Sequence, residues 1–404
     1  MTPPSPRLGR VLALCPENCA RYNHVRALRP LCAELVELDF IETFKRLGIV
    51  AARDSIARVA AERRIEVFFV SFYGDSFLLP PEFLRGLRKD LGLKIVLVCY
   101  DDETTFDTHS KHYAQAVDAV VTTDYFSVAA YRALGVPAVL CLTSVSKEMY
   151  PALGLPRDID VSFVGNCLKT DRPRYLEFLA ENGIKVESFG RGSRHGFLPA
   201  AEAPKVIGRS KISLSFSRLE HTPWLHGRNP ANGREMGHKG RTIEVAMTRS
   251  FCLSEWYPAL PHVFEIGREI DCWTDRASLL EKIRYYLSHD EERERIAARA
   301  HERALREYED GPYFGRVLDE LEPILSASPG GREPPPLVKT REFKERQVND
   351  LTVHALSLLL HGRPRAAARL APELFQYGPG TFLTGAGGGL ARSVSILIRK
   401  LRGV

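Results

Sequence analysis

The 404-residue sequence has no run of roughly 18 consecutive apolar residues, so it predicts no membrane-spanning helix. Residues 1–10 lack a long apolar stretch behind a basic start, so we expect no secretory signal. Paired CxxC motifs are absent as well, which leaves zinc ribbons and dithiol redox sites unsupported. The eight cysteines are dispersed, and several fall inside apolar runs. This pattern favours reduced, packed thiols in a cytoplasmic protein.

Glycine is missing from the turn after the first expected strand. A dinucleotide-binding Rossmann unit has GxGxxG at that point, so that its backbone can approach a pyrophosphate. Here the turn reads Pro16-Glu17-Asn18-Cys19-Ala20. The main argument for assigning the chain to the oxidoreductases or the S-adenosylmethionine methyltransferases is therefore missing. A metal-binding Asp-x-Asp motif in a nucleotide-site context is not found either.

The net positive charge is confined to the last part of the chain. The formal net charge is +6, but residues 337–404 contain eleven Lys and Arg against four Asp and Glu, an excess of seven. The preceding 336 residues therefore carry a net charge of −1. A near-neutral body offers no electrostatic footprint for nucleic acid, so we expect no nucleic-acid partner.

Short apolar runs alternate with helical patterns along most of the chain. In the first half, the expected strands are residues 11–15, 67–72, 94–100, 117–122 and 138–142. The pattern then restarts, with expected strands at residues 160–164, 185–189, 211–216, 251–254 and 263–266. Strands separated by helices form parallel, doubly wound sheets. The sequence therefore predicts an α/β protein with two Rossmann-like doubly wound domains and a helical C-terminal extension.

Proline-rich connections set the expected domain boundaries. Pro151 and Pro156 separate the two α/β units, and the segment SASPGGREPPP reads as a linker. We therefore expect an N-terminal Rossmann-like domain at 1–150, a second domain at 151–325, the linker at 326–336 and a basic helical tail at 337–404. In the first domain, residues 25–35 place four apolar side chains on one side of an expected helix.

The most informative stretch for chemistry is residues 212–254. Lys239, Gly240 and Arg241 stand where a helix is expected to begin, and cations and helix N-terminal amides both suit a diphosphate. Glu244 lies three residues after Arg241 on the same helical face, and a carboxylate accepts hydrogen bonds from ribose hydroxyls. Arg218 ends the preceding strand and is a further candidate for the same anion.

An alternative for the Arg241–Glu244 spacing is an exposed surface pair that contributes a few tenths of a kcal/mol. Spacing alone slightly favours this alternative. The polar loop between Arg218 and Lys239 adds three candidate polar residues, namely Asn229, Asn232 and Arg234.

The segment KGRTIEVAMTRSFCLSEWYPAL closely resembles the glycosyltransferase-like domain of the spore-maturation glycosyltransferase family. That family has a Lys-Gly-Arg-x-x-Glu run at the start of a helix, followed by a strand and a Glu-x-x-Pro-x-Leu segment. Two upstream segments, DVSFVGN and SKISLSFSR, match as well, and so does the stretch beginning CYDDETTFDTHSKHY. The resemblance covers residues 94–321 and implies a GT-B fold, with the donor bound in the second domain and the acceptor in the first.

The resemblance also implies roles for particular residues. Glu244 matches the family glutamate that holds the donor ribose, and Gly165 with Asn166 matches a turn of the donor cleft. The chain departs from the family at Arg249-Ser250, where a Cys-Gly or Gly-Gly pair is usual. This departure bears on how closely the backbone approaches the nucleotide.

An acidic run, Asp101-Asp102-Glu103, follows the strand expected at 94–100. Ligand crevices of open sheets lie at the carboxyl ends of parallel strands, so Asp101 or Asp102 is a candidate general base for an acceptor hydroxyl. A solvated loop or a helix cap is an equally good reading.

Two groups of residues have a composition that metal sites use, but neither is favoured. They are Cys15, Cys19 and His24, and Asp107, His109 and His112. A metal-free site is preferred because cationic side chains and helix ends can stabilise a leaving diphosphate.

The function expected from the sequence is transfer of a sugar from a nucleotide-diphosphate sugar to a carbohydrate, protein or small-molecule acceptor, without a metal or other cofactor. The nucleotide sugar acts as co-substrate. Two alternatives keep the fold: a catalytically silent sugar- or nucleotide-binding module, and a nucleotide-sugar epimerase.

The end of the tail predicts an amphipathic helix at residues 390–401, with basic residues beside its apolar side. Such a segment is a candidate for peripheral contact with an anionic membrane. Docking of its apolar side on the catalytic body or on a second copy is the favoured alternative. The glycines at 385–389 are expected to make a flexible connection.

Overall fold

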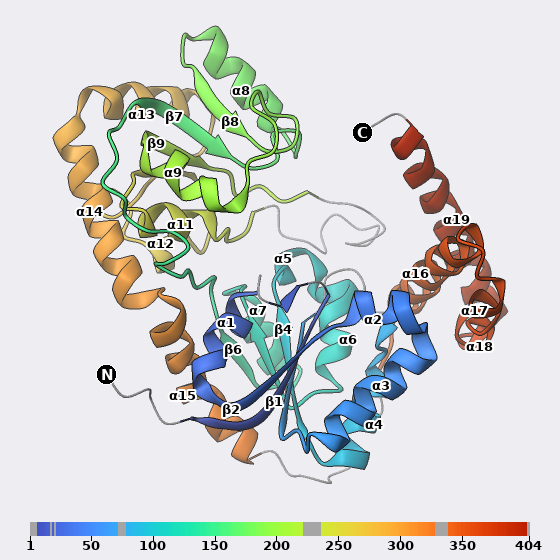
Figure 1. The fold of residues 1–404 in the computed structure, drawn as a ribbon. Coiled ribbons are helices and arrows are strands. Elements are labelled where there is room, and N and C mark those ends of the chain that lie inside the picture. Colours follow the sequence, from blue (N-terminus) through green and yellow to red (C-terminus); the bar gives the residue numbers. More distant parts are fainter. Residues whose placement is uncertain are drawn as a thin grey trace.

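The computed structural model describes residues 6–16, 18–19, 22–71, 78–220, 236–327 and 338–401, without the side chains of residues 45 and 397–401. Two lobes, each built on a parallel sheet, and a helical tail make up this part of the chain (Figure 1). The α/β class and the two doubly wound domains predicted from the sequence are confirmed.

The first sheet has six parallel strands in the order β2-β1-β3-β4-β5-β6. The strands are β1 (Leu8–Cys15), β2 (Cys32–Asp39), β3 (Val67–Ser71), β4 (Lys94–Cys99), β5 (Ala119–Thr122) and β6 (Ala138–Leu140). Side chains alternate between the two faces, so Phe68 packs into one hydrophobic core and Phe69 into the other. Except at the edge strand β2, both faces are largely buried, which explains why the other strands read as continuous apolar runs.

Helices cover both faces of the first sheet. They are α1 (Asn23–Leu28), α2 (Phe40–Leu47), α3 (Ile49–Glu62), α4 (Pro81–Leu91), α5 (Asp102–Thr105), α6 (Lys111–Ala114) and α7 (Ser127–Ala133). Side chains of α2, α3, α4 and α6 share one core, and α1 lies on the opposite face. A five-residue π-helical turn, Phe106–Ser110, separates α5 from α6.

The second sheet has five parallel strands in the order β11-β10-β9-β7-β8. They are β7 (Ile159–Val164), β8 (Val186–Phe189), β9 (Ser210–Ser215), β10 (Cys252–Glu255) and β11 (Asp271–Trp273). Its helices are α8 (Arg172–Glu181), α9 (Ala203–Gly208), α11 (Arg241–Met247), α12 (Leu260–Val263), α13 (Arg276–Ser288) and α14 (Asp290–Glu307). Asp275 caps α13 through a capping box with Ser278.

Helix α15 (Asp310–Ala327) leaves the second domain and packs on the first sheet (Figure 1). Its Phe314 ring lies 6.3 Å from the ring of Phe69 on β3. Asp310, at its first turn, accepts a hydrogen bond of 3.1 Å from Arg26 on α1. The range 151–325 expected for the second domain thus ends in a helix that braces the first.

Two local predictions were wrong. The helix expected over 25–35 ends at Leu28, a 3-10 turn follows, and the edge strand β2 starts at Cys32. Pro30 interrupts the helix because it offers no backbone N–H, and the half-buried side chains of β2 do not read as a core strand. The strand expected over 263–266 overlaps the end of helix α12 instead, and strand β11 follows at Asp271.

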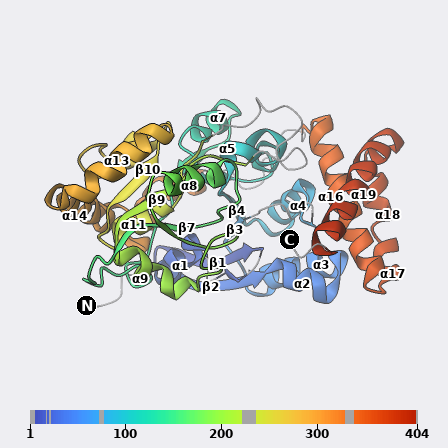
Figure 2. The same ribbon diagram turned by 90° about the horizontal axis from the view of Figure 1, so that it is seen from above.

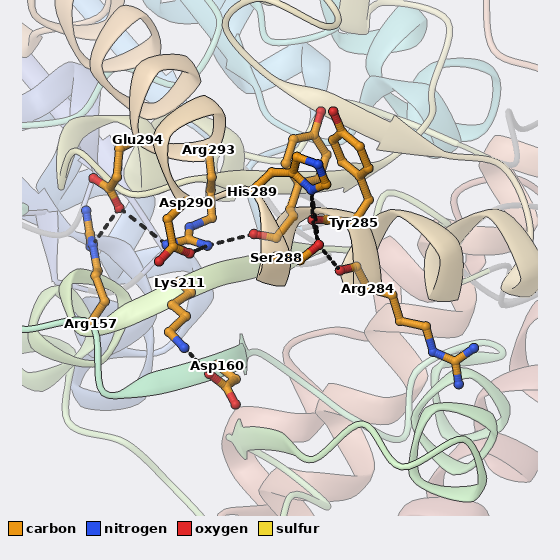
Figure 3. A network of polar contacts seen from close by, with 11 residues as sticks. Arg157, Asp160, Lys211, Arg284, Tyr285, Ser288, His289, Asp290, Arg293 and Glu294 are labelled. Atoms are coloured by element: carbon orange, nitrogen blue, oxygen red, sulfur yellow. Dashed lines mark hydrogen bonds and ion pairs between the residues drawn. The ribbon is translucent and has the colours of Figure 1, made fainter.

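Arg157, in the connection between the domains, ties several parts of the second domain together. Its Nη1 donates to the carbonyl oxygen of Gly208 at 2.5 Å and to the hydroxyl of Ser250 at 2.8 Å. Its Nε lies 3.3 Å from Glu294, which is also 3.9 Å from Arg293 (Figure 3). The connection is therefore fixed to α9 and to α14.

The hydrogen bonds of Arg157 also explain how the chain accommodates Arg249-Ser250 where the family usually has a glycine. Arg249 adopts a left-handed conformation, with φ of 58°, and its carbonyl oxygen accepts from Arg157 at 2.6 Å. The Ser250 hydroxyl donates to the carbonyl oxygen of Ile207 at 2.9 Å. Hydrogen bonds to both residues hold a backbone conformation that glycine adopts more readily.

The tail packs against the first domain, on the side opposite α13 and α14 (Figure 2). Its helices are α16 (Arg341–Leu360), α17 (Pro364–Ala368), α18 (Ala371–Phe375) and α19 (Pro379–Leu401). Phe343 of α16 is buried in the core shared with α2–α4, so the tail is fixed to the domain. None of the helices in the described part of the chain is long and apolar enough to cross a bilayer.

The flexible connection expected at 385–389 is wrong, because these glycines lie inside α19. A Cβ atom on Gly385 would lie 2.7 Å from the carbonyl oxygen of Glu345, and one on Gly389 would lie 2.7 Å from that of Asn349. The glycines therefore allow α19 to approach α16 closely. Further along α19, Leu390 and Val394 are half exposed. The side of α19 that carries these two residues is thus not docked on the first domain.

Candidate functional site

The carboxyl ends of β7 and β9 form the centre of the candidate site. The strand order reverses between these two neighbours, because the chain runs from β7 outward to β8 and from β9 outward to β10. Open parallel sheets bind ligands at such a point. Arg172, at the start of α8, bridges the two strand ends by donating to the carbonyl oxygen of Asn166 at 3.0 Å and to that of Phe216 at 3.5 Å.

The Gly165-Asn166 turn after β7 has a structural basis. Gly190 adopts φ of 119°, and a Cβ atom on it would lie 2.2 Å from the carbonyl oxygen of Gly165. The backbones of β7 and β8 therefore meet closely just beyond their ends. The Asn166 side chain accepts a hydrogen bond of 3.0 Å from the backbone of Leu168, which shapes the turn.

Arg218 follows β9 and is held by two carboxylates. Its Nε lies 3.5 Å from Asp171 and 3.7 Å from Glu255. Glu255 is fully buried and accepts from the backbone N–H groups of Ser217 and Arg218, each at 2.9 Å. Glu255 thus fixes the loop that carries Arg218, and the charge of this arginine is already offset.

Lys169 belongs to the same group of cations, although sequence reasoning missed it. Burial lowers the pKa of Lys169, and repulsion from Lys239 and Arg172 lowers it further, while Asp101 acts in the opposite direction. Cationic side chains that gather at the carboxyl ends of parallel strands are suited to hold an anionic ligand. The available signal was position, since Lys169 and Arg172 come directly after the Gly165-Asn166 turn.

The segment from Gly237 to Gly240 brings the second domain against the first. Lys239 Nζ lies 3.7 Å from Asp101 Oδ1, and a Cβ atom on Gly240 would lie 2.6 Å from the Thr143 side chain. A Cβ atom on Gly237 would lie 2.4 Å from Glu103 Oε1. Candidate residues of the two domains therefore meet at this segment.

Arg241 and Glu244 form an ion pair of 2.5 Å on α11. Their side chains are 23% and 21% exposed, so this is a partly buried pair and not the exposed surface pair of the alternative reading. Tyr150 lies beside both residues, and burial together with Glu244 raises its pKa to about 12. A binding role for Glu244 stays a prediction.

Asp101 and Asp102 of the acidic run have different surroundings. Asp102 is buried and accepts from the hydroxyls of Thr122 at 2.7 Å and Tyr131 at 2.8 Å. Burial raises its pKa. Asp102 therefore ties α5 to β5 and α7, whereas Asp101 faces Lys239 of the other domain.

Glu103 is the member of the run that sequence reasoning did not single out. It is 3% exposed, and neither carboxylate oxygen has a hydrogen-bond partner among the described residues. Burial raises its pKa to about 7, and Lys239 opposes this rise. A buried carboxylate with this pKa, at the junction of two domains, is suited to accept a proton near neutral pH.

The two residue groups weighed as metal sites have protein partners instead. Cys19 Sγ donates to the carbonyl oxygen of Leu38 at 3.2 Å, and His24 contacts the Tyr100 hydroxyl. Asp107 pairs with Lys111 at 2.7 Å. Within the described ranges, no three His, Cys, Asp or Glu residues gather as metal ligands would. Asn229, Asn232 and Arg234 lie outside the described residues.

Residues 172–309 match the family model described as "Glycosyl transferase-like". A glycosyltransferase from Rickettsia africae ESF-5 is similar in structure, with a TM-score of 0.54 and 11% identity over 80% of this chain and 100% of that one. The Anabaena protein HepE, in a structure with UDP-glucose, has a TM-score of 0.55 and 10% identity over 78% of this chain and 99% of that one. The fold is GT-B.

The GT-B fold predicted by the resemblance is thus confirmed, and the glycosyltransferase-like match agrees with the broader family. The spore-maturation type stays a prediction. No curated protein sequence matches the chain significantly. The matched segment contains Arg172, Arg218, Lys239 and the Arg241–Glu244 pair, whereas Glu103 lies outside it.

Proposed function

We propose that the protein is a glycosyltransferase whose second domain binds a nucleotide-diphosphate sugar and whose first domain presents an acceptor hydroxyl. The observation that carries the proposal is the group of Lys169, Arg172 and Lys239 at the carboxyl ends of β7 and β9. A diphosphate with two negative charges would relieve the repulsion among these cations. The glycosyltransferase-like match over residues 172–309 supports the same assignment.

In the proposed reaction, the bond between the anomeric carbon and the diphosphate oxygen breaks, and its electron pair stays on the diphosphate. Lys239 and Lys169 stabilise the charge that grows there, so no metal is required. The acceptor oxygen forms the new bond to the anomeric carbon. Its proton passes to Glu103, the unpaired carboxylate at the domain junction.

A panel of nucleotide diphosphates and nucleotide sugars tests the proposal by thermal shift. HepE has been seen with UDP and with UDP-glucose, so uridine compounds come first. A ligand present at 100 times its Kd stabilises the fold by about 2.7 kcal/mol, which is readily detected. Slow hydrolysis of the bound donor would support a transferase. A new sugar isomer would indicate an epimerase, binding without turnover a silent module, and no binding at all would overturn the donor site.

Glu244→Ala should weaken binding of the preferred nucleotide diphosphate by about 1.5–3 kcal/mol, because a hydrogen bond from the ribose to a charged group is lost. Calorimetry on the purified variant measures this. Glu281→Ala, which removes an exposed glutamate from α13 of the same domain, should leave the affinity unchanged. Equal affinity of the Glu244→Ala variant and the wild type would exclude the ribose role.

A further inference from the structure

A cavity of about 490 Å³ lies between the first domain and the tail. Its walls are residues 47–51, at the junction of α2 and α3, and residues 362–366, 369 and 370, around α17. Both ribbon views place these helices side by side (Figures 1 and 2). None of the candidate donor-site residues lines this cavity, so a ligand of the cavity would bind apart from the donor.

The lining carries positive charge only. Arg363, Arg365 and Arg369 contribute to the wall, and no carboxylate does. Glu373 on α18 is held by Arg53 of α3 through two hydrogen bonds of 2.8 and 2.9 Å. In the described part of the chain, neither Arg365 nor Arg369 pairs with an acidic side chain. The wall is therefore electrostatically suited to an anion.

Backbone groups of α3 reinforce this charge. The first three residues of this helix line the cavity, and the N-cap position is Gly48, which offers no capping side chain. The first turn of this 14-residue helix also lacks an acidic residue. Its N–H groups and the positive end of its dipole thus remain available to an anion. Arginines and a helix start together form a phosphate-binding arrangement.

Exposed apolar residues lie in the wall of the cavity and close to it along the chain. Val50, in the wall, is 49% exposed, and Leu360, at the turn before the arginines, is 81% exposed. Leu47 and Leu359 are 37% and 51% exposed. A free phosphate would make no use of these apolar residues, whereas a phosphate attached to acyl chains would use the arginines and the leucines together. The excess of seven positive charges in residues 337–404 favours an anionic surface as well.

We propose that this cavity binds the phosphate headgroup of an anionic phospholipid and holds the tail and the first domain against a membrane surface. The leucines beside the arginines enter the boundary between headgroups and acyl chains. This site does not depend on the proposed sugar transfer, because the two share no residue.

Sedimentation of the full chain with vesicles tests the proposal. At low salt the protein should pellet with vesicles that contain phosphatidylglycerol and stay in solution with pure phosphatidylcholine. Arg365→Gln/Arg369→Gln should lower the apparent affinity roughly thirtyfold, because each basic residue near an anionic surface contributes about fivefold. Arg295→Gln/Arg299→Gln is the matched control, since it removes two exposed arginines at the same spacing from α14. The control should pellet like the wild type.

Further experiments distinguish a lipid headgroup from free phosphate as the ligand. Leu360→Asn keeps every charge and should weaken vesicle binding by about tenfold. Inorganic phosphate titrated into the protein should bind far more weakly than vesicles. Strong binding of inorganic phosphate that requires Arg365 and Arg369, without vesicle binding, would overturn the lipid assignment. So would equal pelleting of the Arg365→Gln/Arg369→Gln variant and the wild type. Donor binding measured on the same variants reports on the sugar site independently.

Discussion

Replacing Glu103 with glutamine should lower kcat by about 10² to 10⁴, the usual contribution of a positioned general base. Glutamine keeps the size and shape of the side chain, so the contact with Gly237 is preserved, but it cannot accept the acceptor proton. Initial rates with saturating donor measure the loss. Asp102→Asn is the informative comparison, because Asp102 accepts two hydrogen bonds within the first domain. That variant should lose stability instead, by about 1–3 kcal/mol.

The same substitution should change the pH profile. Because burial raises the pKa of Glu103 to about 7, the wild type should lose activity as the pH falls below about 7. In that range, kcat/KM should fall about tenfold per pH unit, since only the ionised carboxylate accepts a proton. The variant should lack this acid limb. An unchanged profile in Glu103→Gln would assign the limb to another group and remove Glu103 from the mechanism.

Stability gives a third readout with a defined sign. In the unfolded chain Glu103 ionises near its ordinary value of 4.5, and in the folded protein near 7. Between these values the folded state binds more protons, so its stability falls as the pH rises. The contribution is fully present below about 4.5 and is lost by about 7, a change of about 3 kcal/mol. Denaturation of Glu103→Gln across this window should show a correspondingly weaker decline than the wild type.

The fold was largely predictable because both sheets consist of buried parallel strands, which appear as short apolar runs. Strand β4 shows this, since five of its six residues are buried and its limits were predicted to within one residue. Strand β2 was missed for the opposite reason. It lies at the edge of the sheet with half-exposed side chains, so its pattern resembled a helix that Pro30 in fact prevents.

The candidate site was only partly predictable. Lys239 and Arg241 belong to a segment that the sequence alone singles out. The direction of each side chain in the acidic run 101–103, in contrast, depends on a short helix and a π-helical turn that the sequence does not reveal. Lys169 belongs to no motif in the sequence, and its place in the site shows only in the folded chain, where Lys239 lowers its pKa. Repulsion between two cations distant in sequence is visible only once the chain has folded.

Lys239→Ala should reduce kcat by about 10² to 10³, because it removes a cation that stabilises the leaving diphosphate. Lys239 lies 3.7 Å from Asp101, is close enough to Glu103 to oppose the rise in its pKa, and repels Lys169. A diphosphate beside Lys239 would relieve this repulsion. Lys211→Ala is the matched control. Lys211 lies near the opposite end of β9, pairs with Asp160 at 2.6 Å and should contribute little to turnover.

A chelator separates this role from metal catalysis. If Lys239 and its neighbours supply the positive charge, wild-type activity should persist in excess EDTA while Lys239→Ala remains slow. The variant should keep the wild-type melting temperature within about a degree or two, because loss of a partly exposed ion pair costs at most about 1 kcal/mol. Full activity in Lys239→Ala, or rates restored only by added manganese in both proteins, would place the catalytic charge on a bound cation instead of on these lysines.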